Sequence, residues 1–260
     1  MNMISPRFGE NMPRRQQSLS HYRPDFDMDM VQRLLGRRRR RHMTRTTGKR
    51  LTTYRRPVLD RLRPRVTWKV YDITACTGDS IALQNGGNTA RLGSRKMAAS
   101  LKGADKLVCF VATIGAGIDK MIEAFGAKGS IADAYVIDAL ASGAIENTAQ
   151  RFQDDFIHRL SRRSYVAGLR FSPGYCDWSI GEQNTLFSLL DCENIGVSLS
   201  DTALMNPRKS ISAVFGLYDP KRAPRNLDYN PCSRCGKGDC IARRSSGTAA
   251  TPAKQHHNEQ

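Results

Sequence analysis

Residues 130–160 carry the longest periodic pattern in the chain, and this pattern places the strongest limit on the fold. Apolar side chains recur there at steps of three and four residues, as on one face of an α-helix. These side chains belong to Ile137, Ala141, Ile145, Ala149, Phe152, Phe156 and Leu160. Ser130 and Asp133 resemble the capping box that begins many helices. Because so long a helix must bury its stripe, we expect it to lie at the centre of the core.

Three further segments predict strands around this helix. Residues 66–73 are rich in β-branched and aromatic side chains, and residues 106–114 form a continuous apolar run. Residues 209–218 read as a strand whose small side chains allow a neighbour to approach closely. We therefore expect an α+β fold, a twisted and mainly antiparallel sheet with a long central helix.

A Gly-x-Gly turn at Gly115 and Gly117 follows the second predicted strand and opens a helix. A dinucleotide-binding fingerprint needs a third glycine, and Lys120 stands in its place. The pattern therefore favours a tight strand-to-helix turn over a nucleotide site.

Charge divides the chain unevenly. The net charge is +17, and residues 1–65 contribute +13 of it, with 18 Lys/Arg against 5 Asp/Glu. We expect residues 1–65 to form a disordered basic arm, residues 66–218 the folded domain, residues 219–240 a Cys-rich segment and residues 241–260 a disordered tail.

Five consecutive arginines, Arg37–Arg41, stand in the arm. Such a run can contact nucleic acid or another anionic surface, or it can be a solvated extension. No aromatic platform accompanies it, so the extension is the favoured reading and nucleic acid the less favoured partner. No signal peptide or membrane-spanning run is visible, and we expect a cytoplasmic protein.

The segment from Arg170 to Tyr175 reads Arg-Phe-Ser-Pro-Gly-Tyr. Pro173 and Gly174 favour a rigid turn between the arginine and the tyrosine. An arginine fork suits a carboxylate, and a tyrosine ring can face a cation. By itself this turn is more typical of a surface loop with an ordinary salt bridge than of a binding site. Ser179 and Glu182 predict the N-cap of the helix that follows.

The order of motifs after this turn resembles the activation domain of cobalamin-dependent methionine synthase, in its stand-alone bacterial form. The resemblance rests on Arg170, Pro173, Gly174 and Tyr175, then on Ile195–Gly196, Leu199, Asp201–Thr202, Met205, Pro207 and Ser210–Ser212. Residues 110–119 are also similar to that family, and the likeness spans about residues 66–218. The chain lacks the family's paired-tyrosine segment, and Asp72 is the nearest candidate by position for an acidic residue of the family.

The resemblance implies a role in reductive reactivation of a methyltransferase, methionine synthase or a related corrinoid protein. In that reaction an oxidised cobalamin is reduced by a donor such as flavodoxin or ferredoxin and is methylated by S-adenosylmethionine (AdoMet). The resemblance assigns AdoMet binding to Arg170, Ser172, Gly174 and Tyr175. It places the loop with Ser198, Asp201, Thr202 and Met205 near the corrin. Glu146, beside the helical stripe, is more typical of a helix edge than of a ligand contact.

Three cysteines close to the C-terminus have the spacing of a metal site. Cys232, Cys235 and Cys240 lie around two glycines, and Cys176 is the foremost candidate for a fourth ligand, ahead of Cys192 and His256. Zinc, an iron–sulfur cluster and unligated thiols remain open. Cys76 and Cys109 have apolar neighbours and are predicted core residues.

A second hypothesis of another class is a non-catalytic binding module. It would be stabilised by a metal at the cysteines and would contact nucleic acid through the basic arm. Removal of residues 1–65 should abolish such binding, whereas the reactivation hypothesis expects activity to survive.

Overall fold

A computed structural model describes residues 17–19, 22, 24–36, 43–160, 165–224 and 227. The helices in these residues are α1 (Met28–Leu34), α2 (Arg45–Leu59), α3 (Arg95–Ser100), α4 (Gly117–Ala127), α5 (Ile131–Arg159), α6 (Glu182–Ser188) and the short 3-10 helix η1 (Glu193–Ile195). None of the described helices is both long and apolar enough to cross a bilayer.

One antiparallel sheet forms the middle of the molecule. Its strands run in the order β4-β3-β2-β5-β9-β6, and β1 pairs with another part of β2. The strands are β1 (Gln17–Leu19), β2 (Arg65–Cys76), β3 (Ser80–Asn85), β4 (Asn88–Gly93), β5 (Lys106–Thr113), β6 (Val166–Phe171) and β9 (Ser210–Tyr218). A separate small hairpin joins β7 (Ser198–Leu199) to β8 (Met205–Asn206). The predicted fold class is confirmed.

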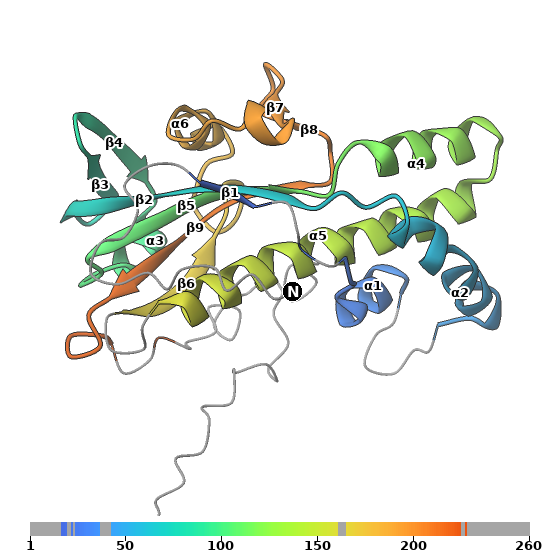
Figure 1. Ribbon diagram of the computed structural model, residues 1–260, viewed down its shortest axis with the longest axis horizontal. Helices are drawn as coiled ribbons and strands as arrows, with labels where there is room; N and C mark the ends of the chain where they lie inside the picture. The colour runs from blue at the N-terminus through green and yellow to red at the C-terminus, as the bar shows by residue number, and fades with distance from the viewer. Residues whose placement is uncertain are drawn as a thin grey trace, which may run out of the picture.

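Helix α5 covers one face of this sheet, as Figure 1 shows, and it is the helix that the stripe predicts. All seven stripe residues are buried. Aromatic rings fill the space between helix and sheet, with the Phe110 and Phe152 ring centroids 4.8 Å apart and those of Trp68 and Phe156 5.0 Å apart. Ser130 is the N-cap of α5, as predicted, but the capping box does not form, because Ser130 makes no side-chain cap and Asp133 instead pairs with Arg50 at 2.9 Å.

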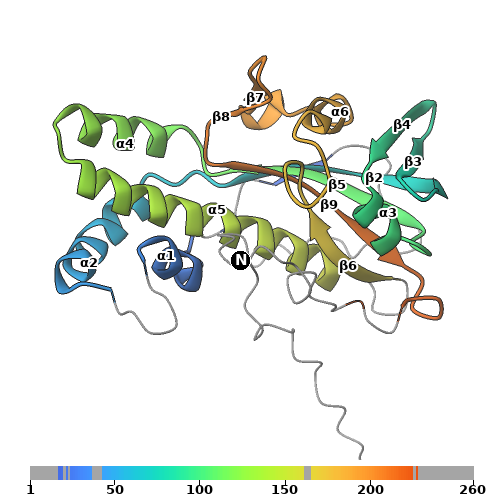
Figure 2. The ribbon, with the colours of Figure 1, turned by 180° about the vertical axis from the view of Figure 1, so that it is seen from behind.

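Short elements cover the opposite face. Residues of α3, α6 and η1 share a core cluster there, and Figure 2 shows α6 and the β7–β8 hairpin on the side of the sheet away from α5. This second core cluster includes Leu107, Trp178, Leu186 and Val214. Buried side-chain bonds tie these elements together; for example, the Tyr71 hydroxyl donates to the Leu189 carbonyl at 2.7 Å.

The predicted disordered arm is wrong for residues 24–36 and 43–65, which fold against α5. Gly143 of α5 explains the contact with α1: the Asp27 N–H donates to the Gly143 carbonyl at 2.9 Å, and a Cβ at this position would collide with Val31. Leu51 and Val58 of α2 are buried in the same cluster. Packing against α5 orders these residues, although their polar composition predicts disorder.

Candidate ligand-binding site

The turn after β6 is closed by its own backbone. Gly174 has a φ of 85°, which glycine adopts readily, and its N–H donates to the Trp178 carbonyl at 2.8 Å. Trp178 is buried and anchors the turn, whereas the Tyr175 ring is 52% exposed. The turn is thus rigid, as its sequence predicts, and it presents an aromatic ring to solvent. Ser172 is half-buried within it.

Arg170 lies on the face of the sheet that α5 covers, where its cross-strand partner is Phe215 of β9. The next residue, Phe171, belongs to the core cluster on the opposite face. The Arg170 Nη2 lies 2.5 Å from the Glu146 Oε2, and their side chains are only 12% and 30% exposed. This pair offers one positive and one negative group at the start of the turn.

Glu146 is therefore more than the helix-edge residue that the sequence favours. In the sequence, only its position next to the apolar stripe indicates a role for Glu146, because its partner Arg170 lies 24 residues away. The pairing depends on β6 running beside α5, where Gln153 also donates to the Gly168 carbonyl at 3.2 Å.

Asp177 ties the turn to α3. Its carboxylate accepts from the Ser94 hydroxyl at 2.7 Å and from the Lys96 N–H at 3.2 Å. Partial burial acts to raise the pKa of Asp177, but the hydrogen bonds outweigh it and lower the pKa below its ordinary value. Sequence analysis missed this residue, since its donors precede it by more than eighty residues.

The loop between β7 and β8 carries the residues assigned to the corrin side. Ser198, Asp201 and Thr202 are exposed, and Met205 is half-buried against the second cluster. Leu204 is 65% exposed. The loop thus presents polar groups and one apolar side chain to solvent.

Gln183 of α6 holds this loop in place through hydrogen bonds. It is buried, its Nε2 donates to the Ala203 carbonyl at 2.9 Å, and its Oε1 accepts from the Ser212 hydroxyl at 2.8 Å. The loop, α6 and the central strand β9 are joined by one side chain. The sequence misplaced the start of this helix: the N-cap is Gly181, and Ser179 instead accepts from the Gly181 N–H at 3.2 Å.

The cysteine predictions divide by position. Cys232, Cys235, Cys240 and His256 lie outside the described residues, while Cys176 is exposed. Cys109 is fully buried, as predicted, and Cys76 is half-buried. Cys192 is also buried, and burial raises the pKa of its thiol to about 12, which disfavours the thiolate that a metal needs. No group of three metal-ligating side chains occurs among the described residues.

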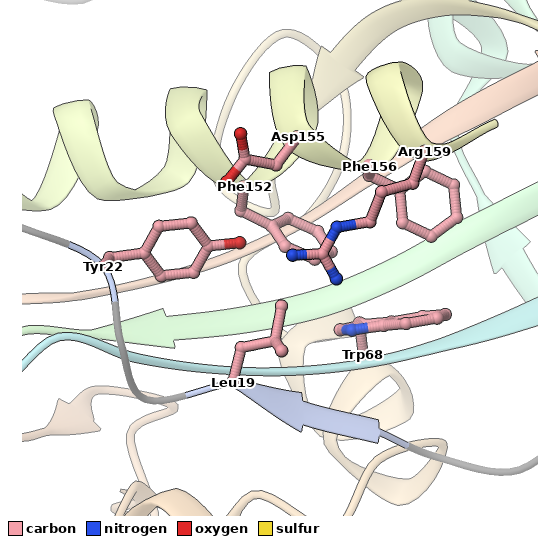
Figure 3. Close-up of a pocket in the computed structure, with 7 residues that line it drawn as sticks. All are labelled: Leu19, Tyr22, Trp68, Phe152, Asp155, Phe156 and Arg159. Atoms are coloured by element: carbon pink, nitrogen blue, oxygen red, sulfur yellow. The ribbon is translucent and has the colours of Figure 1, made fainter. Parts of the chain in front are cut away.

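Two hollows occur elsewhere on the described surface. Figure 3 shows the first, which is too tight for a water molecule and is lined by Leu19, Tyr22, Trp68, Phe152, Asp155, Phe156 and Arg159. Burial, followed by the nearby Asp155 charge, raises the pKa of Tyr22, so its phenol stays neutral. The second is an open trough of about 350 Å³ across β2, β3 and β4, towards the sheet edge opposite to β6. Asp72 lies on β2, where it pairs with Lys106.

Comparison with known proteins confirms the resemblance. Residues 96–223 match the family model of the activation domain of vitamin B12 dependent methionine synthase. Among solved structures, the chain is similar in fold to the MetH reactivation domain bound to AdoHcy, with a TM-score of 0.58 and 18% identity over 86% of this chain and 84% of that chain. No curated protein matches the sequence. The fold likeness covers more of the chain than the family match.

Proposed function

We propose that this protein binds AdoMet and serves the reductive reactivation of a cobalamin-dependent methyltransferase, methionine synthase or a related corrinoid protein. One observation carries the proposal: the family match spans both the Arg170–Tyr175 turn and the Ser198–Met205 loop. The structural relative was crystallised with AdoHcy, the product that AdoMet leaves after methyl transfer.

The residues at the turn fit the amino-acid end of AdoMet. That end carries one carboxylate and one ammonium, and the half-buried pair of Arg170 and Glu146 offers one group for each. Tyr175 supplies an exposed ring for the adenosyl or sulfonium part, and Ser172 and Gly174 supply polar backbone without a bulky side chain.

The role of the chain in this proposal is positioning. Glu146 holds the Arg170 guanidinium in place before a ligand arrives, so little side-chain entropy is lost on binding. When bound, AdoMet supplies an electrophilic methyl group to reduced cobalt on the partner. Ser198, Asp201, Thr202 and Met205 face that partner, and Gln183 keeps their loop in register with the sheet. A donor such as flavodoxin or ferredoxin supplies the electron.

A metal at Cys232, Cys235, Cys240 and Cys176 belongs to the same proposal. Cys176 is exposed at the turn, in keeping with a metal site at the surface. An anaerobic visible spectrum with metal analysis distinguishes the choices. A thiolate-to-iron band indicates a cluster, a colourless zinc-loaded protein indicates zinc, and a metal-free protein contradicts the site.

A reactivation assay tests the function. The full chain is added to an inactive, oxidised cobalamin-dependent methyltransferase together with AdoMet and the electron donor, and recovery of methyltransferase activity is followed. We expect recovery to require both the chain and AdoMet. Equal recovery without the chain would contradict the proposal.

The binding-module hypothesis needs a different test from the one its sequence suggests. Removal of residues 1–65 would strip α1 and α2 from α5 and expose Ile137 and its neighbours, so loss of function would follow from unfolding. Point substitutions on the exposed surface are required instead.

A further inference from the structure

Helix α2 presents a cationic face to solvent. Successive residues of a helix are about 100° apart, so positions 45, 49 and 56 fall on one side. Arg45, Lys49 and Arg56 are all exposed there, and the gaps between them hold Thr46, Thr52 and Thr53. The opposite side is anchored in the core through Leu51 and Val58. The charges are therefore held in a fixed row by the fold.

Few carboxylates oppose this charge. Residues 43–65 contain eight Lys/Arg and one Asp, a net of +7. Within the described residues, Arg50 pairs with Asp133, and Arg56 pairs with Asp60 in a contact so exposed that it is weak. No ion pair of Arg45 or Lys49 occurs in that same part of the chain.

The positive charge continues past the C-terminus of the helix. Arg61 and Arg63 are exposed there, and their guanidiniums donate to the Pro57 and Asp60 carbonyls at 3.0 and 2.9 Å. These two arginines add cations beyond the C-terminal end of α2.

We propose that this face of α2, defined by Arg45, Lys49 and Arg56, binds the phosphate backbone of duplex nucleic acid. Backbone recognition uses arginine, lysine and hydroxyl side chains, and these predominate on this face, where Asp60 at the C-terminal end is the one carboxylate among residues 43–65. A protein partner would favour aromatic anchors, and a single strand would need stacking platforms. The face carries neither, so a regular polyanion suits it best.

The surface is separate from the proposed AdoMet site. In Figure 1, α2 lies at the end of the molecule where α5 begins, whereas β6, which leads into the Arg170–Tyr175 turn, lies beside the later part of α5. The two activities can therefore be tested independently, and loss of one does not imply loss of the other.

The test is fluorescence anisotropy of a labelled DNA duplex of about 20 base pairs, titrated with the full chain between about 50 and 200 mM salt. The wild type should bind with an affinity that falls steeply as salt rises. The triple variant Arg45→Gln, Lys49→Gln, Arg56→Gln should reduce the slope of log affinity against log salt by about three and weaken low-salt binding at least about tenfold.

A matched control removes the same charge elsewhere. Lys96→Gln, Lys102→Gln, Lys221→Gln neutralises three exposed lysines that lie outside α2, and it should retain most of the binding. Thermal unfolding of both variants checks that they fold. Equal losses in the two variants, no duplex binding by the wild type, or binding of polyglutamate in preference to the duplex would overturn the proposal.

Discussion

The two faces of the central sheet are built on different principles. The face under α5 is sealed by aromatic rings, among them Phe110, Phe152 and Phe215, and it buries apolar surface without directional constraint. The face under α3 and α6 is also apolar at its centre, but short elements are held there by buried side-chain bonds from Tyr71, Gln183 and Tyr218.

Apolar packing and hydrogen bonds therefore contribute differently to the stability of the fold and to the positioning of its elements. Apolar packing tolerates small shifts, whereas hydrogen bonds fix an element at one distance and angle. The Arg170–Tyr175 turn and the β7–β8 loop, which we assign to ligand and partner binding, are held by hydrogen bonds from Asp177 and Gln183, whereas the Arg170 and Glu146 side chains lie on the α5 face. The short elements also bury apolar side chains in their own core cluster, so burial on both faces stabilises the fold.

The largest expected effect comes from the aromatic face. Phe152→Ala should lower the free energy of unfolding by about 3–5 kcal/mol, because its ring contacts those of Trp68, Phe110, Phe156 and Phe215. Chemical denaturation measures the change. Leu204→Ala removes an exposed apolar side chain and should change stability by less than about 0.5 kcal/mol. Similar losses of unfolding free energy in both variants would show that the buried ring contributes no more to stability than an exposed side chain.

A smaller but more local effect is expected on the opposite face. Gln183→Leu leaves the Ala203 carbonyl and the Ser212 hydroxyl without their partner and should cost about 1–3 kcal/mol. Amide hydrogen exchange should accelerate in residues 198–206 while α5 stays protected. The neighbouring Asn184 is exposed, so Asn184→Ala serves as the control. Uniform acceleration along the whole chain would show that Gln183 stabilises the fold without positioning the loop.

The smallest effect concerns Asp177 and depends on pH. Its folded-state pKa is lowered, so its contribution to stability is present above the unfolded pKa and is lost as pH falls through the folded pKa. Asp177→Asn should therefore reduce the loss of stability on acidification below about pH 4. Unfolding curves for wild type and variant between neutral and acid pH measure this. Parallel pH profiles would show that the carboxylate does not hold the turn through its charge.

Local pattern predicts much of this fold. The stripe from Ile137 to Leu160 and the apolar run at residues 106–114 identify α5 and β5, because periodicity and burial are properties of each segment alone. Cys109 is assigned to the core for the same reason.

What the sequence does not predict depends on contacts between distant segments. The docking of α1 requires the missing side chain at Gly143, and the partner of Arg170 lies on another element. Gln183 reads as an ordinary helix residue until Ala203 and Ser212 are brought to it. Sequence therefore predicts which segments are buried better than it predicts the contacts between distant segments.

The most direct test of the central claim is calorimetric titration of AdoMet into the full chain and into Arg170→Ala. Loss of one charge-assisted contact should weaken binding about ten- to a hundredfold. Arg50→Ala removes a comparable ion pair with Asp133 outside the site and should leave the affinity unchanged. Absence of AdoMet binding to the wild type, or equal affinity of wild type and Arg170→Ala, would contradict the placement of the site at the Arg170–Tyr175 turn.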